Sequence, residues 1–396
     1  MSGTAGPRGR TGTTLLAGRG SATQVPGLCA GRRVLVVASR GTLDRAPAAS
    51  WLPPDAPTFT AFHPNPTVGQ AVAAARVRHA SGADLVVGIG GGSALDVAKA
   101  ARVLPGDADE ADDVIAGRRP APADGPELLL VPTTAGTGSE VTQFATLYRG
   151  SRKVSLDTPA ARADIAVVDP ELTETCAADL TWTCAFDTLA HAVESLWSVR
   201  STPRSREWAA QALRALVPVL RDADQLPGRA ERDALSRAAT LAGRAIDLTR
   251  TTAAHAMSYP LTAHLGIPHG LACAINLTWL APLVEGAEPG RVTDPRGPAA
   301  VREAVRELRT LFGAGAGSRG QDLAGVLRSL LDRRAPGPYA TRTGTPLGVL
   351  VAEGMSSDRM TGTPVRLERH EVRAGLDTIL CGDTGGKADA ICATTG

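Results

Sequence analysis

The 396-residue sequence has few aromatic residues, few histidines and no long apolar runs. Phenylalanine, tryptophan and tyrosine make up 3% of the chain, and no basic segment is interleaved with them, so nothing indicates nucleic-acid binding. No apolar stretch approaches the roughly 20 residues that a membrane-spanning helix requires. The 42 basic and 40 acidic residues nearly cancel and leave a formal charge of +2.

Cysteine is also scarce. The six cysteines are scattered and form no C-x-x-C pair, so they indicate neither a disulfide framework nor a zinc ribbon. Residues 1–14 contain basic and small residues without an apolar core segment, and we expect a disordered tail rather than a signal peptide. Together these features favour a cytoplasmic globular protein with neither a membrane nor a nucleic acid as partner.

Two different patterns divide the chain near residue 173. Before it, short apolar runs within 32–41, 83–90, 127–132 and 163–172 alternate with helical segments, one of which ends at Gly82. Strands that alternate with helices predict βαβ units and a parallel sheet. After it, 183–198, 206–223, 231–246, 299–313 and 364–380 have helical spacing, whereas 333–366 shows no assignable pattern and 381–396 is expected to be disordered. We therefore predict an α/β domain at 15–173 and an all-α domain at 174–396.

Two glycine-rich turns follow predicted strands: GIGGGSALDVAKA at 88–100, which opens a helix, and PTTAGTGSE at 132–140. Glycine lets the backbone approach an anion closely, and a helix N-terminus offers free N–H groups to phosphate. In an open α/β sheet, ligands bind at the carboxyl ends of the strands. The pair of turns predicts a long phosphate-bearing ligand such as a dinucleotide. The alternative is two ordinary turns without a ligand.

Histidine is concentrated in one place, HAMSYPLTAHLGIPHG at 255–270. Upstream, Asp187 and His191 are four residues apart on a predicted helix and share one face. We expect Pro260 to break the helix that carries His255, and His269 to begin the next helix. One carboxylate and three imidazoles can bind a divalent first-row metal, and the absence of cysteine at these four positions disfavours a structural zinc cage. The alternative is a group of packed or surface histidines.

In order along the chain, GGGSALDVAKA, PTTAGTGSEVT, VVDPEL, FDTLAHAVE and GIPHG resemble the iron-dependent (group III) alcohol dehydrogenase family. The resemblance implies a dehydroquinate synthase-like architecture: an α/β dinucleotide-binding domain with a parallel sheet, then an all-α metal-binding domain. It implies that one divalent metal, Fe²⁺ in preference to Zn²⁺, is bound by Asp187, His191, His255 and His269. The cofactor contacts it implies are Asn65, Gly91, Gly92, Ser93, Asp96, Thr133, Thr134, Thr137, Thr142 and Lys153.

One departure from the family concerns the cofactor. Members that prefer NAD usually carry an acidic residue just after the first strand, whereas this chain has Ser39 and then Arg40. A guanidinium can pair with a 2′-phosphate, so we predict NADPH as the preferred cofactor, with NADH possible. The alternative is that Arg40 is a solvated surface residue.

A second departure concerns the substrate. Many members have a histidine four residues after the third ligand, where this chain has Tyr259. Tyrosine can hydrogen-bond an oxygen or relay a proton, so Tyr259 is the candidate catalytic residue. HAMSYPLTAHLGIPHG and residues 194–209 are most similar to the phosphonoacetaldehyde reductase branch. Arg200, Arg204 and Arg206 could bind a phosphonate, or form a solvated helix face; His264 is expected to be structural.

The resemblance implies an oxidoreductase that reduces phosphonoacetaldehyde to 2-hydroxyethylphosphonate in the biosynthesis of phosphonate natural products, including antibiotics. One alternative is a reductase of the same family for another small aldehyde or diol. Another is a dehydroquinate-synthase-like metal-dependent lyase, and a third is a non-catalytic binding protein. Because family members are often dimers or larger, we expect a homodimer or a larger homo-oligomer.

Overall fold

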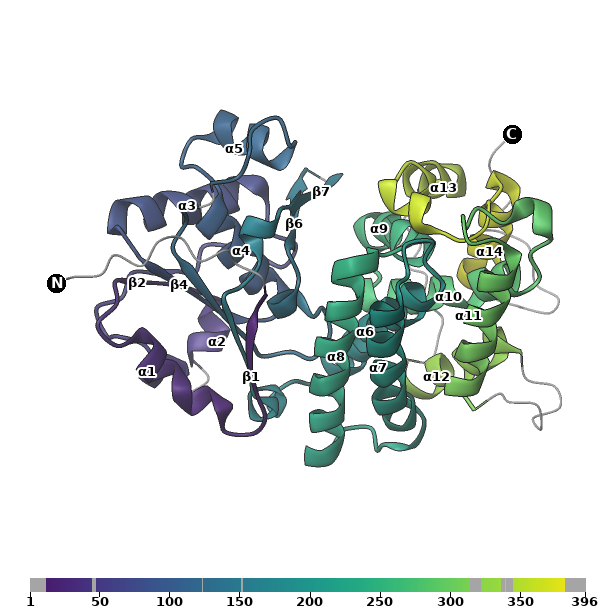
Figure 1. Ribbon diagram of the computed structural model, residues 1–396, viewed down its shortest axis with the longest axis horizontal. Coiled ribbons are helices and arrows are strands. Elements are labelled where there is room, and N and C mark those ends of the chain that lie inside the picture. Colours follow the sequence, from purple (N-terminus) through teal and green to yellow (C-terminus); the bar gives the residue numbers. More distant parts are fainter. Residues whose placement is uncertain are drawn as a thin grey trace. The chain divides into compact units, whose positions relative to one another are not determined.

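The computed structural model describes residues 12–44, 48–122, 124–150, 152–313, 322–335, 339 and 345–381. The chain divides into two compact units, 1–175 and 176–396, which are shown in Figure 1. The sequence predicts this division at residues 173–174. Most of the predicted tail and of the predicted disordered end lies outside the described residues, but strand β1 already begins at Thr14, inside the predicted tail.

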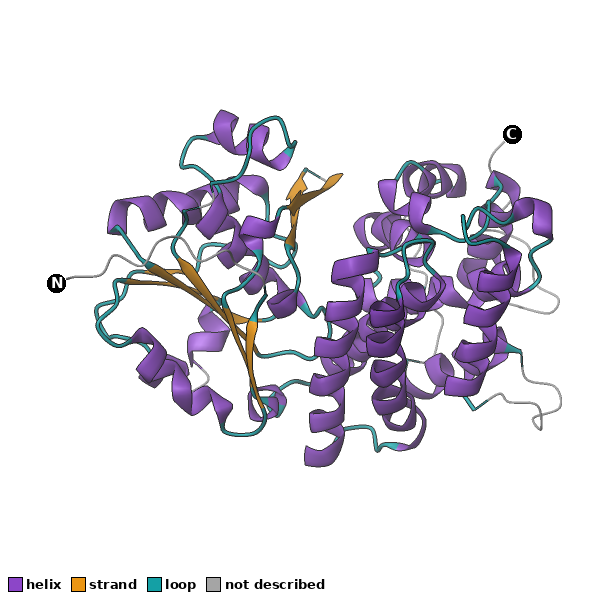
Figure 2. Ribbon diagram, viewed as in Figure 1, coloured by secondary structure: helices purple, strands orange, loops and turns teal. Residues whose placement is uncertain are grey.

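The described residues of the first unit contain a six-stranded parallel sheet in the order β1-β8-β5-β4-β2-β3. The central strands are buried on both faces, which explains why they are continuous apolar runs in the sequence. The predicted parallel sheet is therefore confirmed, and Figure 2 shows it in orange. Its strands are β1 (Thr14–Ala17), β2 (Val34–Ala38), β3 (Thr58–Phe59), β4 (Leu85–Gly90), β5 (Glu127–Pro132) and β8 (Ile165–Val168).

Both faces of the sheet are covered. On one face Val34 and Val36 of β2 pack with Val25 and Cys29 of α1, and on the other Leu35 and Val37 pack with α3 and α4. Helix α3 begins at a capping box formed by Thr67 and Gln70 and ends at Gly82, whose φ is 59°. The helices are α1 (Val25–Cys29), α2 (Arg40–Asp44), α3 (Val68–Ser81), α4 (Gly92–Val103) and α5 (Ala108–Ile115), with 3-10 turns η1 (Ser21–Gln24), η2 (Ala48–Trp51), η3 (Ser139–Val141), η4 (Pro159–Ala161) and η5 (Pro170–Thr173).

An antiparallel hairpin, β6 (Phe144–Arg149) and β7 (Arg152–Asp157), was not predicted from the sequence. Its strands carry few β-branched residues, and β7 begins with two cations, so the usual strand pattern is weak. The hairpin packs against α4 and brings Lys153 to the part of the unit that contains the glycine-rich turns.

The second unit is helical, and within its described residues the only β pairing is an isolated bridge between Val292 and Val365. Helix α6 lies among α7, α8, α10 and α11 and is the most deeply buried of these elements along its C-terminal half. No helix in the described ranges is long and apolar enough to cross a bilayer. The elements are α6 (Ala178–Trp197), α7 (Pro203–Asp222), α8 (Arg229–Thr249), α9 (Ala253–Leu265), α10 (His269–Glu285), α11 (Pro298–Leu311), α12 (Leu323–Arg334), α13 (Leu347–Met355) and α14 (Arg369–Cys381), with η6 (Pro289–Arg291) and η7 (Asp358–Gly362).

Pro260 does not break its helix, so that prediction was wrong. Helix α9 continues through Pro260 to Leu265 and ends at Gly266, whose φ of 68° is favoured by glycine. An interior proline costs about 3 kcal/mol of helix stability. The packing of α9 against α10 and α13 offsets this cost. Helix α10 also contains an interior proline, Pro282, and its packing against neighbouring helices offsets the cost in the same way. His269 begins α10, as predicted.

Candidate metal centre and cofactor loops

The four predicted metal ligands lie together in the helical unit. Asp187 and His191 come from α6, His255 from α9 and His269 from the first residue of α10. The Asp187 Oδ1 atom lies 3.6, 3.4 and 3.8 Å from the Nε2 atoms of His191, His255 and His269. Two ligands of one tetrahedral metal, each about 2.1 Å from it, are about 3.4 Å apart. The spacing therefore suits a single small cation.

The chemistry of these groups also suits a cation. Asp187 Oδ1 and His255 Nε2 are buried and have no hydrogen-bond partner among the described residues. A buried polar atom without a hydrogen-bond partner lowers the stability of the folded protein unless water or a bound ion interacts with it. Burial alone would raise the pKa of the Asp187 carboxyl, but the surrounding imidazoles outweigh it and hold the pKa well below its usual value. A divalent metal fits this site, and the role of the four residues as its ligands is our proposal.

Glu194 is a buried residue beside the proposed ligands that was not predicted from the sequence. Its Oε2 contacts Nδ1 of His255, while its Oε1 accepts hydrogen bonds from the N–H groups of Thr252 (3.1 Å) and Ala254 (2.8 Å). With Nδ1 held as the donor, Nε2 of His255 faces Asp187. The pKa of Glu194 is lowered because His255 and Thr252 outweigh the effect of burial. Its spacing of seven residues from Asp187 on α6 could have placed it on the same helix face.

Ser258 contacts His269, which lies on the more exposed side of the centre. Its hydroxyl donates to the carbonyl of His255 (2.8 Å), and its Oγ lies 3.2 Å from Nδ1 of His269, from which it can accept. The His269 side chain is 33% exposed, whereas the Asp187 side chain is 7% exposed. Tyr259 stacks on His269 with ring centroids 5.9 Å apart. The more open side of the centre thus carries Tyr259, and its catalytic role stays a prediction.

Two further residues complete the description of this region. Cys273, one turn after His269 on α10, places its Sγ 3.8 Å from His269 Nε2, so the structure adds a cysteine that the sequence analysis did not include. His264 Nε2 lies 2.8 Å from Glu353 Oε2 and links α9 to α13, which agrees with its expected structural role.

In the α/β unit, the two glycine-rich turns lie side by side at the carboxyl ends of β4 and β5. The N–H of Thr133 donates to the carbonyl of Gly90 (2.9 Å). A Cβ on Gly91 would lie 3.4 Å from Thr134 Oγ1, and one on Gly92 would lie 2.8 Å from Thr137 Cγ2. The first turn of α4, which the structure describes in full and which includes Ser93, has no acidic residue and no side-chain cap. Its free N–H groups suit a phosphate.

Asp96 and Thr142 hold these turns together. Asp96 accepts hydrogen bonds from the Ser139 hydroxyl (2.7 Å) and the Thr146 N–H (3.0 Å), and burial raises the pKa of its carboxyl despite the nearby cations, which include Lys153. The Thr142 hydroxyl, on a residue that is 1% exposed, accepts from Lys99 Nζ (3.0 Å). Both residues support the loops from within the unit, and their contact with a cofactor stays a prediction.

The remaining predicted cofactor residues are at the surface. The Ser39 hydroxyl lies 2.8 Å from Thr42 Oγ1 at the start of α2. Arg40 is exposed and begins α2, two residues after the end of β2, the neighbour of β4 in the sheet, so it lies at the same edge as the glycine-rich turns. Asn65 is exposed and has a φ of 60° just before α3. Their cofactor roles stay predictions.

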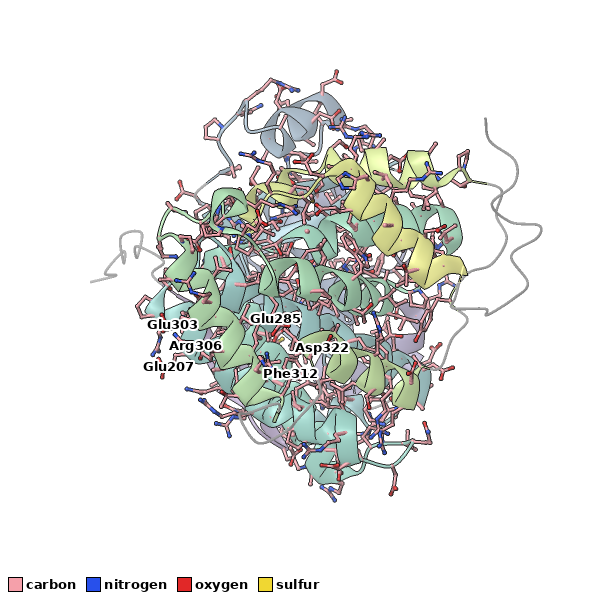
Figure 3. All side chains as sticks on the ribbon, turned by 90° about the vertical axis from the view of Figure 1, so that its right-hand side faces the viewer. Glu207, Glu285, Glu303, Arg306, Phe312 and Asp322 are labelled. Atoms are coloured by element: carbon pink, nitrogen blue, oxygen red, sulfur yellow. The ribbon has the colours of Figure 1, made fainter. Side chains whose placement is uncertain are left out.

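The arginines near residue 200 are not equivalent. Arg204 donates to Glu207 (2.9 Å). Arg206 donates to Glu307 of α11 (2.6 Å) and lies 3.5 Å from Glu303 of the same helix. Figure 3 shows Glu207 and Glu303 at one edge of the helical unit. Both guanidinium groups are therefore engaged with surface carboxylates. Arg200 lies in the loop between α6 and α7 and contacts η7 instead.

Comparison with known sequences gives the same family for both units. Residues 12–170 match the family described as "Iron-containing alcohol dehydrogenase", and residues 181–319 match "Fe-containing alcohol dehydrogenase family, C-terminal". Phosphonoacetaldehyde reductase of Streptomyces viridochromogenes is 42% identical over 63% of this chain and 66% of that protein. Sulfoacetaldehyde reductase of Bilophila wadsworthia is 32% identical over 65% of this chain and 62% of that protein. The matched part thus spans just under two thirds of these relatives.

Solved structures extend the similarity over nearly the whole chain. The crystal structure of sulfoacetaldehyde reductase from Bifidobacterium kashiwanohense in complex with NAD⁺ is 26% identical and covers 94% of this chain and 98% of that one, with a TM-score of 0.79. This chain belongs to the iron-containing alcohol dehydrogenase family, whose members are oxidoreductases of alcohol and aldehyde groups. The predicted resemblance and fold class are confirmed.

Proposed function

We propose that this protein reduces phosphonoacetaldehyde to 2-hydroxyethylphosphonate with NADPH, as a step in making a phosphonate natural product. The observation that carries the proposal is the similarity to the Streptomyces phosphonoacetaldehyde reductase, together with Tyr259 beside the metal centre. A homodimer or larger assembly in the cytoplasm is part of the same proposal. A hydride would pass from the nicotinamide to the carbonyl carbon, and a proton to the carbonyl oxygen.

In the helical unit, Asp187, His191, His255 and His269 would hold the metal, which when bound acts as a Lewis acid toward the aldehyde. Glu194 and Ser258 orient two of the imidazoles. The phenol of Tyr259 stacks on the partly exposed His269 and would donate the proton. A phenol is a poor base at neutral pH but can donate a hydrogen bond to a developing alkoxide.

A phosphonate needs cations, and two arginines lie at the η7 turn, which packs against α9. The Arg359 side chain is 11% exposed, and Arg200 donates to the Thr361 hydroxyl (3.3 Å). The loop is further fixed by the Val199 N–H, which donates to the Gly362 carbonyl (3.1 Å). We propose Arg359 and Arg200 as the phosphonate-binding residues. Arg359 also has a carboxylate partner, but its Nε lies 3.9 Å from Asp358 Oδ1. Arg204 and Arg206 donate to carboxylates over shorter distances, 2.9 and 2.6 Å.

In the α/β unit, the N-terminus of α4 would bind the pyrophosphate, and Arg40 would pair with the 2′-phosphate of NADPH. Because Arg40 is exposed at the sheet edge that carries the glycine-rich turns, it can approach the adenosine ribose without moving buried structure. This is the support for NADPH rather than NADH.

The test is a comparison of substrates with anaerobically purified protein loaded with Fe²⁺ or Zn²⁺. NADPH consumption is measured with phosphonoacetaldehyde, sulfoacetaldehyde and propanal, and repeated with NADH. We expect the highest kcat/KM with phosphonoacetaldehyde and NADPH. Equal activity on propanal would contradict the phosphonate assignment, and a higher activity on sulfoacetaldehyde would favour a sulfonate, the substrate type of two similar proteins. No net NADPH consumption would favour a lyase.

The arginines are tested separately. Arg359→Met and Arg200→Met should raise KM for phosphonoacetaldehyde by about 10- to 100-fold, since a charge-assisted hydrogen bond contributes about 1.5–3 kcal/mol. The KM for propanal, which has no anionic group, should be unchanged. Arg204→Met is the matched control, because that side chain pairs with Glu207. Equal effects on both aldehydes would show that the arginines are structural.

A further inference from the structure

Cys273 lies within the cluster of metal-binding groups. It follows His269 by four residues on α10, so both side chains share one helix face. Its Sγ lies 3.8 Å from Nε2 and 4.0 Å from Nδ1 of His269. The ligand atoms of Asp187, His255, His269 and Cys273 all lie within 4.8 Å of one another. The thiol is fully buried, so no solvent separates it from the cluster.

We propose that Cys273 is a further ligand of this metal, bound as the thiolate. The inference rests on the metal site of the proposed function but not on its substrate. With five protein ligands, the angles between neighbouring ligands are about 90–120°, and a sulfur about 2.3 Å and a nitrogen about 2.1 Å from the metal are then about 3.1–3.8 Å apart. The observed 3.8 Å between Sγ and His269 Nε2 lies at the upper end of that range.

A second observation points to the same place. Asp187 Oδ1 and His255 Nε2 are aimed into the cluster, are buried and have no hydrogen-bond partner in the described part of the chain. A thiol cannot satisfy both, because it has a single weak donor. A cation bound among the carboxylate, the imidazoles and the sulfur would satisfy all of these atoms at once.

Ligation would release the thiol proton to water, leaving a thiolate–metal bond and no change in oxidation state. A coordinated divalent metal supplies the positive charge that deprotonates a thiol. A sulfur donor also favours Zn²⁺ more than a site of oxygen and nitrogen alone would.

The test is zinc X-ray absorption of the full chain loaded with Zn²⁺ alone. We expect a sulfur shell at about 2.3 Å beside the nitrogen and oxygen shell at about 2.0–2.1 Å. Cys273→Ala should remove the sulfur shell and keep the other one. Cys184→Ala is the matched control, because this cysteine on α6 is outside the cluster and should leave both shells intact.

A second readout uses Co²⁺, whose thiolate complexes absorb by charge transfer in the near ultraviolet. The band should be present in the unmodified protein and in Cys184→Ala, and absent in Cys273→Ser. This variant keeps a polar side chain of the same shape and is used if Cys273→Ala fails to fold. Stoichiometric Zn²⁺ with only nitrogen and oxygen neighbours would overturn the proposal, as would a sulfur shell that persists in Cys273→Ser. A sulfur shell in protein that reduces no aldehyde would support this inference and contradict the proposed function.

Discussion

Glu194 on α6 binds His255 and the start of α9 at the same time. One carboxylate oxygen contacts the imidazole Nδ1, and the other accepts hydrogen bonds from N–H groups at the N-terminus of the helix that carries the imidazole. The same side chain therefore sets both the position of α9 and the orientation of a proposed metal ligand. A ligand held in this way loses no rotational freedom when the metal binds.

Glu194→Gln should lower metal affinity by about 10- to 100-fold, because the amide cannot provide both the charge and the pair of acceptors. Competition with a coloured zinc chelator measures this affinity. Glu207→Gln is the control, since that carboxylate lies at the surface beside Arg204. Unchanged affinity in Glu194→Gln would show that the contact has no role in metal binding.

Gly270 allows α10 to approach α6 closely, directly after His269. A Cβ at this position would lie 2.1 Å from the Thr183 carbonyl oxygen and 2.9 Å from Asp187 Cβ. Gly270→Ala should therefore separate the helices, destabilise the protein by about 1–3 kcal/mol or more, and abolish stoichiometric metal binding. Thermal unfolding and metal analysis check both effects. Gly348→Ala on α13, which meets nothing within 4 Å, should alter neither.

Arg40→Glu should change the cofactor preference. A carboxylate would repel the 2′-phosphate of NADPH and can accept from the ribose hydroxyls of NADH. We expect the ratio of kcat/KM for NADPH over NADH to fall by about 10- to 100-fold, since a charge-assisted hydrogen bond contributes about 1.5–3 kcal/mol. Arg214→Glu, at an exposed position on α7, is the control. An unchanged ratio would identify Arg40 as a solvated surface residue.

The pair formed by Arg291 and Glu371 should make stability depend on pH. Two Arg291 nitrogens donate to the two Glu371 oxygens (2.6 and 2.5 Å), and mainly for this reason the pKa of Glu371 is lowered. A carboxyl group whose pKa is lower in the folded than in the unfolded protein stabilises the fold at pH values above its ordinary pKa of about 4.3. This stabilisation is lost as the pH falls through the pKa of the folded state.

Glu371→Gln should therefore destabilise the protein by about 1 kcal/mol at neutral pH. The difference from the unmodified protein should shrink as the pH falls below about 4. Urea titrations at several pH values measure it. A difference that stays constant down to acidic pH would mean that the pair contributes through packing rather than charge.

The sequence predicted those parts of the site whose residues lie close together in the chain. Asp187 and His191 share a helix turn, and His269 follows a Pro-containing loop that starts a new helix. Cys273 follows His269 by four residues, and Glu194 follows Asp187 by seven, so both spacings are short. Their roles nevertheless depend on how three helices pack, and spacing along the chain does not show how helices pack. The prediction that Pro260 breaks its helix was wrong for the same reason: the tertiary contacts of α9 outweigh the local cost of the proline. The β6–β7 hairpin was missed because its polar residues show no clear alternation.

The negative charges of the two buried carboxylates, Asp187 and Glu194, make metal binding compete with proton binding. Asp187 and Glu194 place two negative charges in the interior of the helical unit, and a Cys273 thiolate would add a third, so a divalent ion offsets most of the charge there. Without the ion, protons must serve as counterions: burial opposes a charge on His255, yet the neighbouring carboxylates of Glu194 and Asp187 hold its pKa well above the usual value. Metal loading is then a cation exchange in which the ion displaces protons, and acid shifts that exchange toward the metal-free protein.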